Sequence, residues 1–203
     1  HVLAVLHYRR GLGWEGQALP DGVRCRISGD QPDGYEAVVP AGEPIPLVYV
    51  PAGPFLMGSR ENDTAAWDDE KPQHMRTLPW YWIATTPTTV RQWQASGLPL
   101  HEQPTWSTPE HPVVNVSWHD AQAYCAWAGL CLPTEAEWEK AARGTDGRTY
   151  PWGEEPPGNR TLGAGPVVPL PPEQASPYGA LGMSACVWQW CEDAYDAEAY
   201  RRQ

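Results

Sequence analysis

The chain has 203 residues, with 25 acidic and 14 basic side chains and a formal net charge of −11. Apolar residues make up 41%, enough for one core, whereas the length leaves little room for two domains. The 12 tryptophans exclude a disordered acidic tail, because such tails are poor in aromatic residues. Nineteen glycines and 23 prolines predict many turns and little long helix.

The charge and hydropathy patterns also argue against two kinds of partner. Lysine occurs only at Lys71 and Lys140, and no basic cluster is longer than an arginine pair, whereas phosphate binding needs several clustered cations. We therefore expect no nucleic-acid partner. No apolar run approaches the roughly 20 residues of a membrane span, and the apolar start is too short for a signal peptide.

The first part of the chain predicts short strands separated by frequent turns. Strand candidates lie at residues 2–8, 24–27 and 35–39, between clusters of glycine, proline and aspartate. We interpret residues 1–46 as an irregular β hairpin, a covering arm or the end of an upstream domain. Residues 47–203 then form the main domain, and the chain is expected to be a piece of something longer.

From residue 47 the pattern becomes more regular. Apolar segments at 47–50 and 54–58 predict two strands, joined as a hairpin by the turn residues between them. The acidic stretch 61–70 predicts a solvated loop, with an ion site as the alternative. Residues 78–85 are rich in aromatic and β-branched side chains and predict a buried strand.

Two capping boxes predict the main helices. Ser117 has an acidic residue three positions later and precedes apolar residues spaced i, i+3, i+4, i+7, before Gly129 ends the pattern. Thr134 opens a second helix of the same kind, which ends at Gly144. A third, shorter helix is predicted around residues 88–95.

The cysteines follow no zinc-binding spacing. They are Cys25, Cys125, Cys131, Cys186 and Cys191. Cys125 lies on the apolar stripe of the first predicted helix, which indicates a small buried hydrophobic residue. Cys186 and Cys191 are five positions apart, so that a disulfide, a reactive pair and two inert thiols all stay open. An odd number of cysteines without a recognisable disulfide framework favours a reducing compartment such as the cytoplasm.

Several phrases, read in order, resemble the formylglycine-generating enzyme family, or sulfatase-modifying-factor family. The most specific is Leu-Pro-Thr-Glu-Ala-Glu-Trp-Glu-Lys-Ala-Ala-Arg-Gly at residues 132–144. The others lie at 50–58, 70–74, 111–118, 120–127, 150–153 and 178–190. The resemblance implies an α+β chain with a C-type lectin-like fold: little regular secondary structure, two main helices, small twisted antiparallel sheets and many buried tryptophans.

Members of this family differ in function, and a shared fold does not decide between them. Some oxidise a sulfatase cysteine to formylglycine, with copper held by two cysteines. Others act in sulfur chemistry of the ergothioneine type. The variable proteins of diversity-generating retroelements are not enzymes and use the lectin-like fold as a platform for ligand binding.

The departures from the family pattern favour a binding role. The copper-binding cysteines of the enzymes lie in a C-terminal segment that would follow Gln203, and Cys186 and Cys191 do not occupy the matching place. The calcium phrase of the enzymes uses an asparagine and a glutamate, for which this chain has Gly182 and Gln189. Because calcium prefers charged oxygen ligands, we expect no calcium at these positions.

We therefore predict a non-catalytic binding protein on a C-type lectin scaffold, resembling the variable proteins of diversity-generating retroelements. Its ligand is an unidentified protein or small molecule, and no catalytic residue, metal or cofactor is expected. Its ligand-facing surface is predicted at Cys186, Gln189 and Trp190, with the alternative that Trp188 and Trp190 are both core. A second hypothesis is a copper-dependent formylglycine-generating or sulfoxide-forming oxidase with its cysteine pair beyond Gln203; only then are copper or calcium expected. A third is a sensor domain fused to an upstream effector.

Four tryptophans lie outside the family phrases. We expect exposed aromatic surface among them first, with Trp93 the one that belongs to the core. They are Trp14, Trp67, Trp93 and Trp106.

Overall fold

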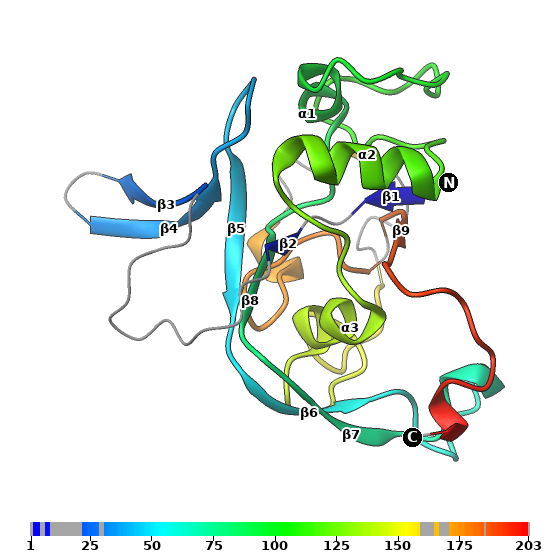
Figure 1. The fold of residues 1–203 in the computed structure, drawn as a ribbon. Coiled ribbons are helices and arrows are strands. Elements are labelled where there is room, and N and C mark those ends of the chain that lie inside the picture. Colours follow the sequence, from blue (N-terminus) through cyan, green and yellow to red (C-terminus); the bar gives the residue numbers. More distant parts are fainter. Residues whose placement is uncertain are drawn as a thin grey trace.

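The computed structural model describes residues 2–4, 7–8, 22–28, 31–158, 165–166, 171–184 and 186–202. In these residues, three short α-helices pack around one five-stranded sheet and two two-stranded sheets (Figure 1). Much of the remaining described chain is turn or extended loop. The α+β class and the small sheets predicted from the sequence are confirmed.

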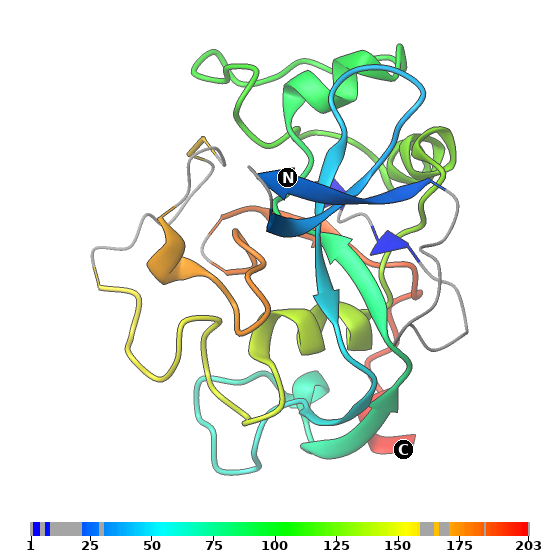
Figure 2. The ribbon, with the colours of Figure 1, turned by 90° about the vertical axis from the view of Figure 1, so that its left-hand side faces the viewer.

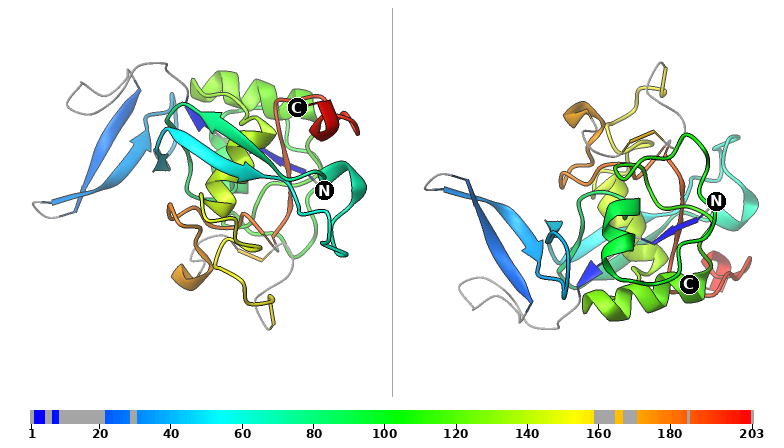
Figure 3. Two further views of the ribbon diagram at one scale, coloured as in Figure 1. Left: turned by 90° about the horizontal axis from the view of Figure 1, so that it is seen from below. Right: turned by 90° about the horizontal axis from the view of Figure 1, so that it is seen from above.

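The largest sheet is antiparallel, with the strand order β2-β8-β5-β4-β3. Its middle strands are β5 (Ile45–Val50) and β8 (Tyr81–Ala84), and every side chain of β8 is buried. β4 (Gln31–Ala37) and β3 (Val23–Ser28) form a hairpin that projects from the body of the molecule (Figure 3). β2 (His7–Tyr8) pairs with β8. Strands from the first 46 residues thus extend the sheet of the main domain.

The predicted hairpin between residues 47–50 and 54–58 is wrong. β6 (Gly53–Met57) pairs with β7 (His74–Leu78) instead of with β5. The link between β5 and β6 is bonded to a helix: Lys140 Nζ donates to the carbonyl oxygens of Pro51 at 2.7 Å and Gly53 at 2.9 Å. Because both strands have partners from later in the chain, the turn residues between them form a corner.

The three helices begin and end where the sequence predicts. They are α1 (Val90–Ala95), α2 (Trp118–Ala128) and α3 (Glu135–Arg143), and α2 ends at Gly129 with φ of +69°. Each helix opens with a complete capping box, in which the capping hydroxyl accepts a backbone N–H and the third helical side chain accepts the cap's own N–H. The capping residues are Thr89, Ser117 and Thr134.

Large aromatic side chains fill the core. Trp82 and Trp93 are fully buried, and Trp93 stacks on Tyr124 of α2 with ring centroids 5.1 Å apart. Cys125 is buried on the same face of α2, and burial raises the pKa of its thiol far above the usual range. Trp67 and Trp106 are exposed, as predicted, whereas Trp14 lies outside the described residues.

The C-terminal part of the chain returns to the body at two places. β9 (Trp188–Trp190) pairs in parallel with β1 (Val2–Ala4). Further on, the turn η3 (Tyr200–Arg202) lies beside β6 and β7 (Figure 2). None of the helices in the described part of the chain has the length and apolar character needed to cross a membrane.

Candidate functional site

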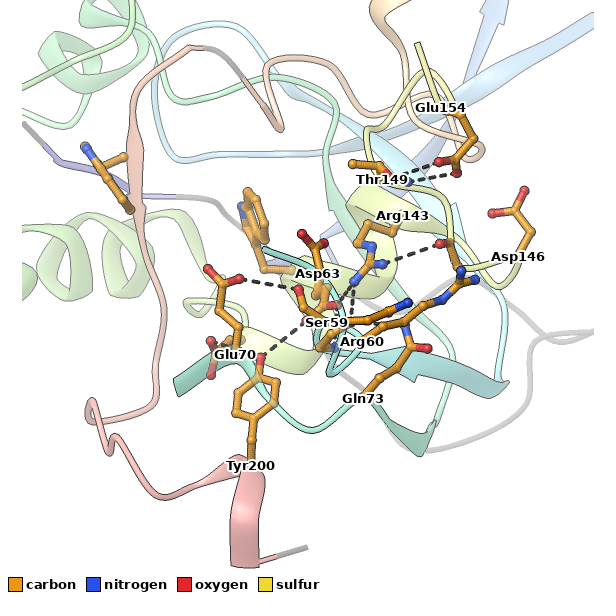
Figure 4. Close-up of a pocket in the computed structure, with 17 residues that line it drawn as sticks. Ser59, Arg60, Asp63, Glu70, Gln73, Arg143, Asp146, Thr149, Glu154 and Tyr200 are labelled. Atoms are coloured by element: carbon orange, nitrogen blue, oxygen red, sulfur yellow. Dashed lines mark hydrogen bonds and ion pairs between the residues drawn. The ribbon is translucent and has the colours of Figure 1, made fainter. Parts of the chain in front are cut away.

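A cavity of about 720 Å³ lies beside α3. Its walls are the loop after β6, one face of α3, the loop 146–154, Trp188 of β9 and Tyr200 of η3. Figure 4 shows Glu70 and Tyr200 on one side, and Asp146, Thr149 and Glu154 on the other. Segments that are far apart in the sequence therefore meet at one site.

The lining of the cavity is predominantly acidic. Two arginines face six carboxylates, and Arg143 is already engaged with Glu139 at 2.5 Å, with the Gly58 carbonyl at 2.9 Å and with the Arg148 carbonyl at 2.8 Å. The carboxylates therefore exceed the cations available to neutralise them. They are Asp63, Glu70, Glu135, Glu139, Asp146 and Glu154.

A hydrogen-bonded network under the cavity fixes its shape. Glu139 Oε1 accepts a hydrogen bond from Gly58 N at 2.8 Å, and its Oε2 accepts one from the Tyr200 hydroxyl at 3.3 Å. The same hydroxyl lies 3.3 Å from Glu135 Oε1. Burial, together with the two carboxylate charges, holds the pKa of Tyr200 far above its usual value, so that the phenol stays protonated and donates.

Glu135 stands at the edge of this network, in the first turn of α3. Burial raises the pKa of its carboxyl, and the nearby charge of Glu139 adds to the effect, while the bond from Tyr200 opposes it. A cation placed beside Glu135 would relieve both the desolvation and the repulsion. A positive group beside Glu135 would therefore favour the charged form of this carboxylate.

The aromatic side chains of the lining are Trp138, Trp188 and Tyr200. Trp188 is 72% exposed, whereas Trp190 packs against the core and donates from Nε1 to the Val116 carbonyl at 3.1 Å. The sequence predicted Trp190 on the ligand-facing surface. Of the two tryptophans of β9, Trp188 lines the cavity and Trp190 does not.

Gln189, which the sequence predicts on a ligand surface, forms two hydrogen bonds within the protein. Its Oε1 accepts the indole N–H of Trp138 at 2.7 Å, and its Nε2 donates to the Gly182 carbonyl at 2.8 Å. An indole nitrogen can only donate and a carbonyl can only accept, so the partners fix the orientation of the amide. A neutral amide whose N–H points at this carbonyl does not fit the donor set of a calcium site.

The cysteines of the described chain do not fit a copper centre either. Cys125, Cys131, Cys186 and Cys191 form no disulfide, and none lines the cavity. Burial raises the pKa of Cys186 to about 11 and that of Cys191 to about 12. Copper(I) binds thiolates, and burial disfavours the thiolate form of these two side chains. Cys186, also predicted to face a ligand, is partly buried and does not line the cavity.

Within the described ranges, which include the acidic stretch 61–70, no group of three or more His, Cys, Asp or Glu side chains is arranged to hold a metal ion. Two acidic residues of that stretch, Asp63 and Glu70, line the cavity instead. The sequence predicted this loop mainly as solvated surface and missed its part in the site.

Comparison with known proteins places the fold. The model of the sulfatase-modifying factor enzyme 1-like domain matches residues 40–203. The solved structure of PvdO from Pseudomonas aeruginosa superposes with a TM-score of 0.60 and 22% identity, over 76% of this chain and 72% of PvdO. At that identity, the likeness shows the fold alone.

Two curated relatives differ in the activity that their names state. The inactive C-alpha-formylglycine-generating enzyme 2 of Bos taurus is 38% identical over 143 residues, which are 62% of this chain and 45% of the relative. The formylglycine-generating enzyme of Thermomonospora curvata is 38% identical over 138 residues, 59% of this chain and 44% of the relative. The chain therefore spans less than half the length of these relatives.

Proposed function

The chain belongs to the sulfatase-modifying factor family, and within it we propose a non-catalytic ligand-binding protein whose site is the cavity beside α3. One observation carries the proposal. The cavity combines carboxylates in excess over cations with an exposed indole, and the described residues that line it include no cysteine or histidine. This set suits recognition of a charged group better than it suits nucleophilic or redox chemistry.

The lining favours a ligand that carries an ammonium or guanidinium group. Glu70 and Glu135 are carboxylates of the lining that could pair with it, and the face of Trp188 could hold a cation by a cation–π contact. The volume of about 720 Å³ is in the range of small-molecule sites. The same chemistry would hold a basic side chain of a protein partner.

A copper-dependent oxidase is the second candidate, and the 38% identity to the T. curvata formylglycine-generating enzyme favours it. The identity to the inactive relative is the same, so that similarity does not discriminate between the two. This function would require a pair of thiolates from outside the 203 residues. Stoichiometric Cu(I) binding and cysteine oxidation by the natural protein would establish it in place of the binding role.

The binding proposal is tested by titrating the 203-residue chain with arginine amide and with spermidine at low ionic strength, using calorimetry. We expect saturable binding that weakens with salt, because exposed charges are screened. Trp188→Ala should weaken it about 3–5-fold through loss of the cation–π contact. Glu135→Gln should weaken it by a similar factor through loss of a charge.

Trp106→Ala is the matched control, because Trp106 is 51% exposed and does not line the cavity. This variant should bind like the wild type. The proposal fails if no cationic compound binds saturably, or if Trp188→Ala and Glu135→Gln bind as tightly as the control.

A further inference from the structure

We propose that the Gln189 side chain takes the structural place of a cation, so that Gly182 and β9 are held against α3 without any metal. The observation is a chain of two hydrogen bonds through one amide. Trp138 Nε1 donates to Gln189 Oε1 at 2.7 Å, and Gln189 Nε2 donates to the Gly182 carbonyl at 2.8 Å.

This amide joins three segments that are otherwise distant. Trp138 belongs to α3, Gln189 is the middle residue of β9, and Gly182 lies in the buried loop before β9, with φ of +69°. That loop is also tied to the large sheet, because Leu181 N donates to the Thr85 carbonyl at 2.7 Å. Gln189 therefore connects the helix to the loop at the point where the loop meets the sheet.

A glutamate in the same position could not make both contacts as an anion. One carboxylate oxygen could accept from Trp138, but the other would face the Gly182 carbonyl oxygen at the present separation of 2.8 Å. Two acceptors at hydrogen-bond distance repel each other unless a proton or a cation lies between them. The NH₂ group of glutamine supplies the hydrogen permanently, which removes the need for either.

The two hydrogen bonds of the Gln189 side chain, which we call the clamp, also affect the rim of the cavity. Trp188 precedes Gln189 in β9 and is 72% exposed on the cavity rim, so it has little burial of its own to hold it there. The bonds of Gln189 fix the backbone next to it. Gln189 is thus a positioning residue for the rim, and this last step alone rests on the proposed function.

The experiment compares the melting temperature of the wild-type chain with those of Gln189→Glu and Gln189→Met, in EDTA and in millimolar CaCl₂. The wild-type value should be the same in both. In EDTA at pH 7.5, Gln189→Glu should melt roughly 5–10 °C lower, as a buried acceptor clash of a few kcal/mol implies for a chain of this length.

The pH dependence of the melting temperature distinguishes repulsion between the introduced carboxylate and the Gly182 carbonyl from mere loss of the two hydrogen bonds. In the Gln189→Glu variant, folding would raise the pKa of the introduced carboxyl, because its protonated form donates to Gly182. The folded variant then binds more protons than the unfolded one, so its deficit grows as pH rises and shrinks towards pH 4. Gln189→Met has no titrating group and should show a smaller deficit that is constant relative to the wild type.

Two results would overturn the proposal. One is a wild-type melting temperature that CaCl₂ raises and EDTA lowers. The other is a Gln189→Glu variant that is as stable as the wild type in EDTA at pH 7.5. Neither readout needs a ligand, so failure of cationic compounds to bind would remove only the proposed function and leave the clamp intact.

Discussion

The substitution Glu139→Gln tests the buried network under the cavity. It keeps the shape of the side chain and one acceptor oxygen but removes the negative charge that faces Arg143 at 2.5 Å. The single carbonyl oxygen that remains cannot accept all the hydrogen bonds that the two carboxylate oxygens accept from Gly58 N, Arg143 and the Tyr200 hydroxyl. The guanidinium is left largely buried without its counter-charge.

The size of the effect follows from the burial of the pair. Breaking a fully buried ion pair by removing one partner costs about 3–5 kcal/mol. Because the Arg143 and Glu139 side chains are 19% and 11% exposed, water screens part of that cost. We expect a loss of about 2–3 kcal/mol in the free energy of unfolding, or roughly 5–10 °C in melting temperature.

Urea unfolding followed by tryptophan fluorescence measures this loss. The control is Glu198→Gln, which breaks an exposed i,i+3 pair with Arg201 and should cost no more than about 0.5 kcal/mol. A double-mutant cycle with Arg143→Met should give a coupling energy of about 1–2 kcal/mol. A Glu139→Gln variant that unfolds like the control, or a coupling energy near zero, would refute the network.

Three further predictions concern single sites. Gly58→Ala should destabilise the chain by more than about 2 kcal/mol, because φ is +85° and the new Cβ would lie 2.8 Å from the ring of Tyr200; thermal melting checks this. Cys186 and Cys191 should be alkylated far more slowly at pH 8 in the folded chain than in urea, since pKa values of about 11 and 12 leave little thiolate; peptide mass spectrometry gives the rates, and equal rates would contradict burial. Ser117→Ala should cost about 1 kcal/mol through loss of the helix cap, and a urea midpoint that does not move would show that the cap contributes nothing.

The local features of the fold could be predicted because they depend on neighbours in sequence. Each capping box needs only residues three apart, and α2 and α3 begin where their predicted boxes lie, whereas the box at Thr89 of α1 was not predicted. The buried strand at β8 follows from its own aromatic and β-branched residues. The lectin-like architecture could be predicted only from the order of the family phrases, because the composition by itself indicates no more than a chain rich in turns.

Strand pairing could not be predicted in the same way. Turn residues between two apolar runs favour a hairpin, but β5 pairs with β8 and β6 pairs with β7, so that the paired residues are 17 to 37 positions apart. The buried Lys140 reinforces this outcome by bonding the carbonyls of the corner. Nothing in the local sequence reveals that a lysine from α3 reaches there.

The site was the least predictable part. Its acidic lining is shared between a loop near residue 63, the first turn of α3 and the loop around residue 150, and each looks like ordinary surface by itself. The Trp-Gln-Trp phrase indicates a surface at β9, but the phrase alone does not show which of its tryptophans lines the cavity. Which tryptophan faces outwards depends on Val116 and the core, which lie distant in sequence.

Two-dimensional NMR of the indole N–H groups, recorded during titration with arginine amide, reports whether a cationic group binds in the cavity beside α3. We expect saturable shifts for Trp188 and Trp138, which line the cavity, and none for Trp106, which does not. Shifts confined to Trp106, or no saturable shift at Trp188 and Trp138, would rule out binding of the cation in this cavity.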